Sequence, residues 1–290
     1  MTLATAQAFS KFVEDLTATS YQKTSFIPVR KNSVDDRLSE KFSAQSDMPY
    51  SKGILMGSAE KNTIIRPFDD IDVLAVFSNS GNAWDKYRYD SKPFLYRIRD
   101  AYDGLSIQQV GARGQAIRVF FQTGGHLDIA PVFDAGNNVY KLPAGDGSWI
   151  STSPTLASGW FADRHKALGY NLSPLVRLAK SWNRAHSKRM RSFHLETVAG
   201  TMFSQLGANH RRALHKFFEW APSRLDVSDP GGQSGSLSSY LTWTGRNELK
   251  TALASAAERA GKAIDAESNG NHTEAKRLWK IILGDDFPTS

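Results

Sequence analysis

The sequence contains no cysteine and no long hydrophobic run. Its 290 residues therefore cannot form a disulfide, a thiolate zinc site or a cysteine nucleophile. The longest apolar runs, such as 73–77 and 119–121, fall far short of the ~20 residues that cross a bilayer. The first 19 residues include Glu14 and Asp15 and have no apolar core, so we expect no signal peptide. We therefore expect a cytoplasmic protein without membrane association.

Acidic residues are scarce in one part of the chain. The whole sequence has 36 Lys and Arg against 29 Asp and Glu, a net charge of +7. Residues 177–216 contain nine of these basic residues and a single acid, Glu196, so the rest of the chain is close to neutral. A localised basic region indicates a polyanionic partner, either a nucleic acid or nucleoside triphosphates.

The composition is that of a folded protein with one large or two modest domains. Hydrophobic residues make up 40% of the chain and charged residues 22%, both ordinary values. The hydrophobic spacing mixes helix and strand periods in the first half and is helical in the second. We therefore expect an α+β half over residues 1–150 and an all-helical half over residues 151–290.

The pattern predicts individual elements in both halves. The first half is expected to hold helices 5–18 and 33–44, strands 52–56 and 69–77, and a hairpin of strands 116–122 and 126–133. Ser33, with Asp36 three residues later, is the expected cap of the second helix. Residues 134–158 are rich in Gly, Asn, Pro and Ser and are expected to be a loop. The second half is expected to hold helices 172–184, 192–207, 211–220, 245–266 and 273–283, with a loop at 226–238.

Two aspartates open the most strongly strand-like segment, Asp70-Ile-Asp-Val-Leu-Ala-Val-Phe77. Because side chains alternate faces along a strand, Asp70 and Asp72 point the same way, with Cα atoms roughly 6–7 Å apart. Leu74 and Val76 continue that face into a core. Two carboxylates beside a buried strand lose hydration and repel each other, which a divalent cation such as Mg²⁺ would offset. The alternative is a pair of solvated acids at the end of a strand.

A third aspartate lies in another apolar strand. Asp128 occurs in His126-Leu-Asp-Ile-Ala-Pro-Val-Phe133, where its immediate neighbours point to the opposite face. The sequence leaves two partners open for Asp128: Arg118 across the predicted hairpin, or the other two aspartates in a cluster of three carboxylates. Such a cluster supplies the ligands that two metal ions ~4 Å apart need for phosphoryl or nucleotidyl transfer.

A Gly-Ser pair follows the first predicted strand. Gly57 and Ser58 precede the acidic strand by about a dozen residues. Glycine lets the backbone approach a phosphate closely, and serine offers both an N–H and a hydroxyl. The helix expected to start at Ala59 would add N–H groups at its N-terminus. Gly-Ser alone is ordinary turn chemistry, so its meaning comes from its combination with the acidic strands.

This combination resembles a known signature. Gly57-Ser58, Asp70-x-Asp72 and Asp128 are similar to the motif of the DNA-polymerase-β-type nucleotidyltransferases. Residues 57–72 more specifically resemble the bacterial cGAS/DncV-like nucleotidyltransferases (CD-NTases), the cyclic oligonucleotide synthases of CBASS anti-phage systems. The likeness runs along nearly the whole chain. Further similar segments are 127–131, 149–154, 175–183, 192–196, 227–230 and 284–288.

The resemblance implies a fold and a metal site. The implied fold is α+β: a polymerase-β-like nucleotidyltransferase core with a mixed sheet, plus a C-terminal helical domain. Asp70, Asp72 and Asp128 would be the catalytic carboxylates and would hold two Mg²⁺ or Mn²⁺ ions. They would act on nucleoside triphosphates bound between the two halves.

The resemblance also implies nucleotide-binding residues. Gly57 and Ser58 would contact phosphate, and Lys180 and Ser192 would bind the β- and γ-phosphates. Phe193 would stack on a nucleobase, a contact worth ~1–3 kcal/mol. The residues alone leave open that Lys180 belongs to a solvated basic face and that Phe193 packs in a core.

The expected function is a metal-dependent nucleotidyl transfer. It joins nucleoside triphosphates, ATP among them, into a cyclic di- or oligonucleotide second messenger that a downstream effector reads in anti-phage defence, with release of pyrophosphate. The alternatives are a linear oligonucleotide synthase or RNA-tailing nucleotidyltransferase, a nucleic-acid-binding protein with an inactive core, and a small nucleotidylating toxin. We expect no obligatory nucleic-acid activator, because the DNA-sensing zinc module of animal cyclic GMP-AMP synthase needs cysteines that this chain lacks.

Overall fold

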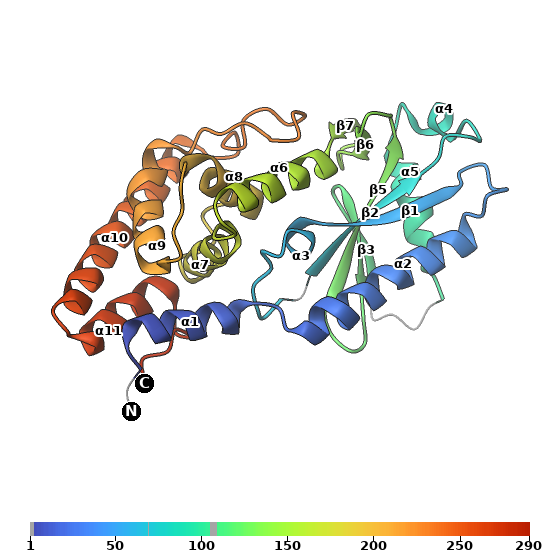
Figure 1. Cartoon of the computed structure of the whole chain (residues 1–290). Helices are drawn as coiled ribbons and strands as arrows, with labels where there is room; N and C mark the ends of the chain where they lie inside the picture. The colour runs from blue at the N-terminus through green and yellow to red at the C-terminus, as the bar shows by residue number, and fades with distance from the viewer. Residues whose placement is uncertain (1–2, 69, 105–108) are drawn as a thin grey trace.

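The computed structural model describes residues 3–68, 70–104 and 109–290. Asp69, the first residue of the predicted strand 69–77, lies outside them. Figure 1 shows the sheet at one end of the molecule and the C-terminal helices at the other. Helices α1 (Thr5–Leu16) and α2 (Ile27–Lys41) run along one side, α1 beside the C-terminal helices and α2 beside the sheet.

The sheet is mixed, as the sequence predicts. Its strands are β1 (Tyr50–Met56), β2 (Asp70–Phe77), β3 (Gln109–Arg113), β4 (Ala116–Phe120), β5 (His126–Asp134), β6 (Tyr140–Pro143) and β7 (Trp149–Thr152). The order is β1-β2-β5-β4-β3, with β6 pairing β5 and β7 pairing β6. Strands β2 and β5 are parallel, and the other described pairs are antiparallel. Two acidic strands that are distant in sequence therefore lie side by side at the centre.

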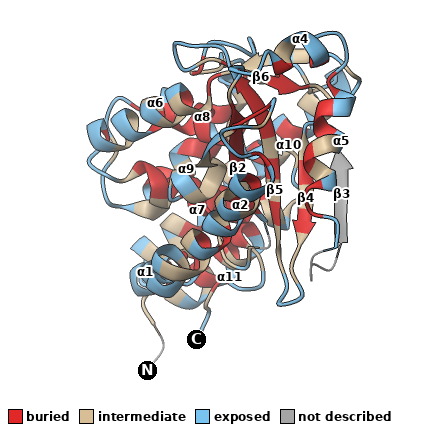
Figure 2. Ribbon diagram, turned by 90° about the vertical axis from the view of Figure 1, so that its right-hand side faces the viewer, coloured by how far each residue is buried: buried red, intermediate tan, exposed pale blue. Residues whose placement is uncertain are grey.

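The two faces of β2 pack against different cores. Ile71, Val73 and Phe77 belong to a large cluster that includes residues of α2 and α5 (Lys92–Asp100). Leu74 and Val76 face a smaller cluster on the other side. Figure 2 shows β2 and β5 as mostly buried strands. Because side chains alternate, the aspartates at the start of β2 continue the Leu74 and Val76 face, as predicted.

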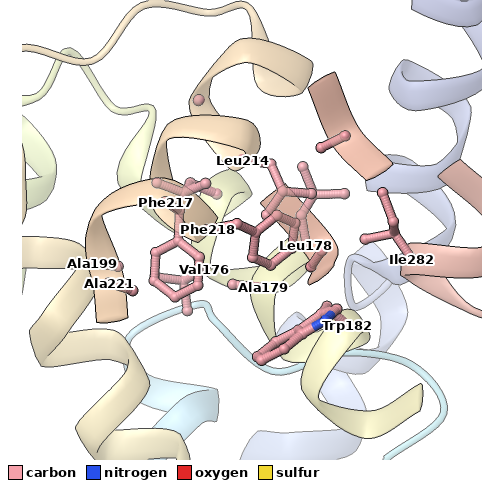
Figure 3. Close-up of a cluster of buried hydrophobic side chains, with 14 of the residues drawn as sticks. Val176, Leu178, Ala179, Trp182, Ala199, Leu214, Phe217, Phe218, Ala221 and Ile282 are labelled. Carbon is pink, nitrogen blue, oxygen red and sulfur yellow. The ribbon is translucent and has the colours of Figure 1, made fainter. Parts of the chain in front are cut away.

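The remaining helices lie mostly in the second half. They are α3 (Gly57–Glu60), α4 (Ala83–Tyr87), α6 (Pro154–Ala167), α7 (Leu172–Ala185), α8 (Ser192–Met202), α9 (His210–Trp220), α10 (Trp243–Ser268) and α11 (His272–Leu283). A continuous apolar core joins α6 to α11, and Figure 3 shows Trp182 of α7, Phe217 and Phe218 of α9 and Ile282 of α11 within it. Phe9 and Phe12 of α1 belong to the same core. None of the described helices is both long and apolar enough to cross a bilayer.

Three predictions about local structure were wrong. The helix expected over 192–207 ends at Met202. Ser33 does not cap a helix, because α2 begins at Ile27 and directly continues a π-helix over Gln22–Phe26. The Ser33 hydroxyl donates a hydrogen bond to the Arg30 carbonyl. Pro28 occupies the first turn of α2, a position that proline favours because its missing N–H is not needed there. The segment 134–158 is not a loop, since it contains β6, β7 and the start of α6. Its glycines and asparagines form the turns between these short elements rather than one long connection.

Candidate functional site

The first feature of the site is a row of charged side chains across three strands. Asp72 on β2 pairs directly with Asp128 on β5, and Asp128 pairs in turn with Arg118 on β4. Asp70 lies two residues before Asp72, opposite His126. The parallel pairing of β2 and β5 thus brings the three predicted carboxylates to one end of the sheet.

Arg118 forms a bidentate ion pair with Asp128. Arg118 Nε and Nη2 donate to the two Asp128 carboxylate oxygens at 2.7 and 2.6 Å. Both partners considered from the sequence are therefore present: Asp128 lies beside Asp72 and also pairs with Arg118. A planar guanidinium fork of this kind fixes the orientation of a carboxylate as well as its charge.

Asp72 carries negative charge that its surroundings do not neutralise. Burial, followed by the nearby charges of Asp70 and Asp128, raises the pKa of Asp72 to about 6, although Lys180 and Lys61 oppose the change. A half-buried carboxylate that is repelled by two other carboxylates needs a cation to offset them. The all-oxygen donor set matches Mg²⁺ or Mn²⁺. Within the described ranges, the three side chains do not already form a closed metal-binding cluster, and the guanidinium of Arg118 occupies the oxygens of Asp128.

The Gly-Ser turn is built against Asp72. Met56, the last residue of β1, pairs with Asp72, and Gly57 follows with a φ of +68°. A Cβ at Gly57 would collide with Asp72 Oδ2, so any other residue would push the carboxylate away. The Ser58 carbonyl accepts hydrogen bonds from the N–H groups of Thr63 and Ile64 at 2.8 and 2.9 Å, which closes the turn.

Two cavities open at this end of the sheet, and all the predicted site residues line one or the other. The aspartate cavity has a volume of about 300 Å³ and is lined by Gly57, Lys61, Asp72, Asp128, Phe193 and Asp229, among others. The basic cavity has a volume of about 580 Å³ and is lined by Ser58, Asp70, Arg118, Lys180, Arg184, Lys188, Arg191 and Ser192, among others. The basic cavity therefore combines several cations and hydroxyls with one exposed carboxylate, a composition that suits a polyphosphate.

Two further residues of the site were not identified from the sequence. Glu196 on α8 is buried and lies between Lys180 and Lys61, at 2.6 and 2.5 Å from their Nζ atoms. Lys180 also donates to the Thr63 carbonyl and hydroxyl at 3.2 and 3.1 Å. One signal for Glu196 was available, because it is the single acid of the basic segment 177–216. Nothing in the sequence singled out Lys61 among the charged residues of its loop.

Comparison with known proteins identifies the family. Residues 1–165 match the Second Messenger Oligonucleotide or Dinucleotide Synthetase (SMODS) domain. The chain belongs to this family. It is 26% identical to the cyclic AMP-AMP-AMP synthase of Escherichia coli strain MS 115-1, over 97% of both chains. It is 27% identical to a probable cyclic nucleotide synthase of Bacillus cereus strain VD146, over 80% of this chain and 81% of that protein.

Solved structures share the fold of this SMODS protein. CdnC of E. coli MS115-1, in a complex named CdnC:HORMA-deltaN, superposes with a TM-score of 0.79 at 24% identity over 98% of both chains. The Vibrio cholerae cyclic AMP-GMP synthase DncV, bound to a linear intermediate, gives a TM-score of 0.74 at 16% identity over 98% of this chain and 97% of that one. The predicted polymerase-β-like core with a C-terminal helical region is confirmed.

Family membership also confirms the predicted activity. The chain is a nucleotidyltransferase of the cGAS/DncV-like type, which joins nucleoside triphosphates into cyclic oligonucleotides. Dependence on a divalent metal is general for the family. The roles of the individual site residues stay predictions.

Proposed function

We propose that ATP is a substrate of this SMODS protein and that Asp70, Asp72 and Asp128 hold two Mg²⁺ or Mn²⁺ ions during the reaction. The observation that supports this most directly is the pairing of Asp72 with Asp128 across parallel strands, beside Asp70 and on the wall of a cavity. Support for ATP comes from relatives named cyclic AMP-AMP-AMP synthases. Divalent ions at such a cluster, when bound, lower the pKa of an attacking hydroxyl and neutralise phosphate charge.

The two cavities suggest how the chain holds its substrates. Lys180 and Ser192 bind the β- and γ-phosphates of one triphosphate from the basic cavity, close to the N–H groups of the Gly57-Ser58 turn. Phe193 stacks on a nucleobase from the aspartate cavity. The carboxylates between the cavities orient the acceptor hydroxyl of one nucleotide toward the α-phosphate of the other. The product of the first transfer keeps its 5′-triphosphate and can serve as the donor for ring closure.

Other parts of the prediction are proposals of the same kind. We place the boundary between a catalytic unit (1–150) and a nucleotide-pocket unit (151–290) near residue 150, with α1 adding to the core of the second unit. We also place the protein in the cytoplasm, where an effector reads its nucleotide product.

The decisive experiment is a product analysis. The full chain is incubated with labelled ATP, GTP, CTP and UTP in Mg²⁺ or Mn²⁺, treated with phosphatase, and the surviving products are identified by mass spectrometry. We expect a phosphatase-resistant cyclic product that contains AMP, and none from the Asp70→Asn/Asp72→Asn double variant. A product that phosphatase degrades completely would instead identify a linear oligonucleotide synthase, and full activity of the double variant would exclude the metal assignment.

A further inference from the structure

Three buried charged side chains, Glu196, Lys61 and Lys180, lie where the two cavities adjoin. The Glu196 side chain is 3% exposed, and those of Lys61 and Lys180 are 8% and 7% exposed. One carboxylate therefore serves two ammonium groups, one from the loop after α3 and one from α7. Burial by itself would raise the pKa of Glu196, but the charges of Lys180 and Lys61 outweigh it, so the pKa is lowered and the carboxylate is ionised.

The two carboxylate oxygens of Glu196 make different contacts. Glu196 Oε1 accepts a hydrogen bond from the Thr63 hydroxyl at 2.6 Å and lies 2.6 Å from Lys180 Nζ in an ion pair. Glu196 Oε2 lies 2.5 Å from Lys61 Nζ but has no partner with the angles of a hydrogen bond among the described residues. The Lys61 ammonium is therefore held to Glu196 mainly by charge attraction. Because this attraction is not directional, other contacts must fix the position of the ammonium.

Two aromatic rings lie close to the Lys61 ammonium. Lys61 Nζ lies 4.9 Å from the ring centroid of Phe193 and 5.8 Å from that of Phe161. Phe161 is buried in the helical core, so the Lys61 ammonium is within reach of one core ring and of the Phe193 ring at the cavity wall. Lys61 and the half-buried Phe193 ring both line the aspartate cavity, so the ammonium and the ring meet at its wall.

We propose that Glu196 and Lys61 are positioning residues for the base-stacking ring: Glu196 fixes the Lys61 ammonium beside Phe193, and the ammonium fixes the ring for stacking on a nucleobase. The same carboxylate anchors Lys180 at the wall of the basic cavity. This inference rests on the proposed function, because it assumes that Phe193 stacks on a base. A cation on one face of an aromatic ring is worth about 0.5–2 kcal/mol, depending on its exposure.

The test compares three ligands across a mutant cycle. Adenosine reports on the base site, inorganic tripolyphosphate on the phosphate site, and ATP on both, each measured by calorimetry on the full chain. Lys61→Met keeps most of the length of the unbranched side chain and removes its charge. We expect it to weaken adenosine and ATP binding by the same factor, about 3- to 10-fold, and to leave tripolyphosphate binding unchanged, because Lys180 keeps its carboxylate.

The second arm tests whether the two residues act as a unit. Glu196→Gln should weaken adenosine binding as much as Lys61→Met does, and the double variant should be no weaker than either single variant. Glu196→Gln leaves two buried ammonium groups without a counterion, so the melting temperature should fall and then partly recover in the double variant. Glu258→Gln, which breaks an exposed Glu–Lys pair of equal length on α10, is the matched control and should change neither affinity.

Each contrary outcome has a distinct meaning. Equal losses of adenosine and tripolyphosphate affinity in Lys61→Met, additive losses in the double variant, or no loss of adenosine affinity would each overturn the positioning role while leaving nucleotidyl transfer intact. A wild-type chain that binds neither adenosine nor ATP would overturn the proposed function itself, and the positioning role with it.

Discussion

At the scale of single residues, two carboxylates of the site each have two charged neighbours. Asp128 has a negative neighbour in Asp72 and a positive one in Arg118, and Glu196 is shared by two lysines. The sequence predicted the carboxylates because strand alternation fixes which side chains share a face. It could not predict Lys61, because the contact of Lys61 with Glu196 joins segments more than 130 residues apart.

Replacing Asp72 should make the metal-free protein more stable. The folded pKa of Asp72, about 6, lies above the ordinary aspartate value, so folding favours the protonated form. The ionised group is therefore destabilising above pH 6, and the penalty disappears as the pH falls toward 4. With about 1.4 kcal/mol per pKa unit, Asp72→Asn should raise the melting temperature by several degrees at pH 8 in EDTA and by little at pH 4.5.

A charge-matched control separates this local effect from general charge reduction. Asp163→Asn removes one negative charge from an exposed position on α6 and should leave the melting temperature nearly unchanged at both pH values. If Asp72→Asn is instead less stable than the wild type at pH 8, a cation of the protein itself already neutralises Asp72.

Replacing Arg118 should change metal affinity and metal-free stability in opposite directions. Arg118→Gln removes the cation that grips Asp128 and leaves three carboxylates without it. We expect Mn²⁺ to bind several-fold more tightly, because the field at the cluster becomes more negative, and the metal-free protein to unfold at a lower temperature. Electron paramagnetic resonance of free Mn²⁺ measures the first effect and calorimetry the second. Weaker Mn²⁺ binding would mean that Arg118 holds Asp128 in its metal-binding orientation.

At the scale of helices and strands, the sequence pattern predicted most of the helices of the second half and missed several short elements, including the amphipathic helix α5. α7, α9 and α11 were found within a few residues of their observed bounds. α6 was missed because its apolar residues do not gather on one side, and β6 and β7 because strands of four residues are too short to show alternation. The start of α2 was missed because its first turns follow a π-helical segment that no local sequence rule marks.

One helix contains a charge that no described group satisfies. Lys276 of α11 is 0% exposed, and its Nζ has no hydrogen-bond partner in the described part of the chain. A buried ammonium without a partner is costly, and methionine fills a similar unbranched space without charge. Lys276→Met should therefore raise the melting temperature, by about 2–4 °C for each kcal/mol gained.

The matched control for this prediction lies one turn further along α11. Lys280 is partly exposed and lies 3.5 Å from Asp285, so Lys280→Met should change the melting temperature little. A lower melting temperature for Lys276→Met, measured by calorimetry beside this control, would show that the ammonium has a stabilising partner after all.

At the scale of the whole molecule, the basic segment 177–216 folds into several separate environments rather than one basic surface. Arg177 and Lys180 are buried. Arg189 pairs with Glu248 at 2.9 Å, and Arg211 pairs with Glu267 at 2.9 Å. The cations that line the basic cavity, Arg184, Lys188 and Arg191 among them, surround the space proposed for triphosphate. Most of the basic residues that indicated a polyanionic partner are thus buried, paired with acidic side chains, or placed at the proposed nucleotide site.

This distribution predicts an enzyme that needs no nucleic acid to become active. Purified protein should make its product from nucleoside triphosphates and a divalent cation alone, and added duplex DNA or RNA should not raise the rate at physiological salt. Few basic residues of the segment are left for phosphate contacts outside the cavity, and such contacts are weakened by screening. The rate is measured with and without duplex at low and physiological salt, with filter binding in parallel. A strict requirement for DNA or RNA would contradict the prediction and assign Arg184, Lys188, Arg189 and Arg191 to a nucleic-acid surface.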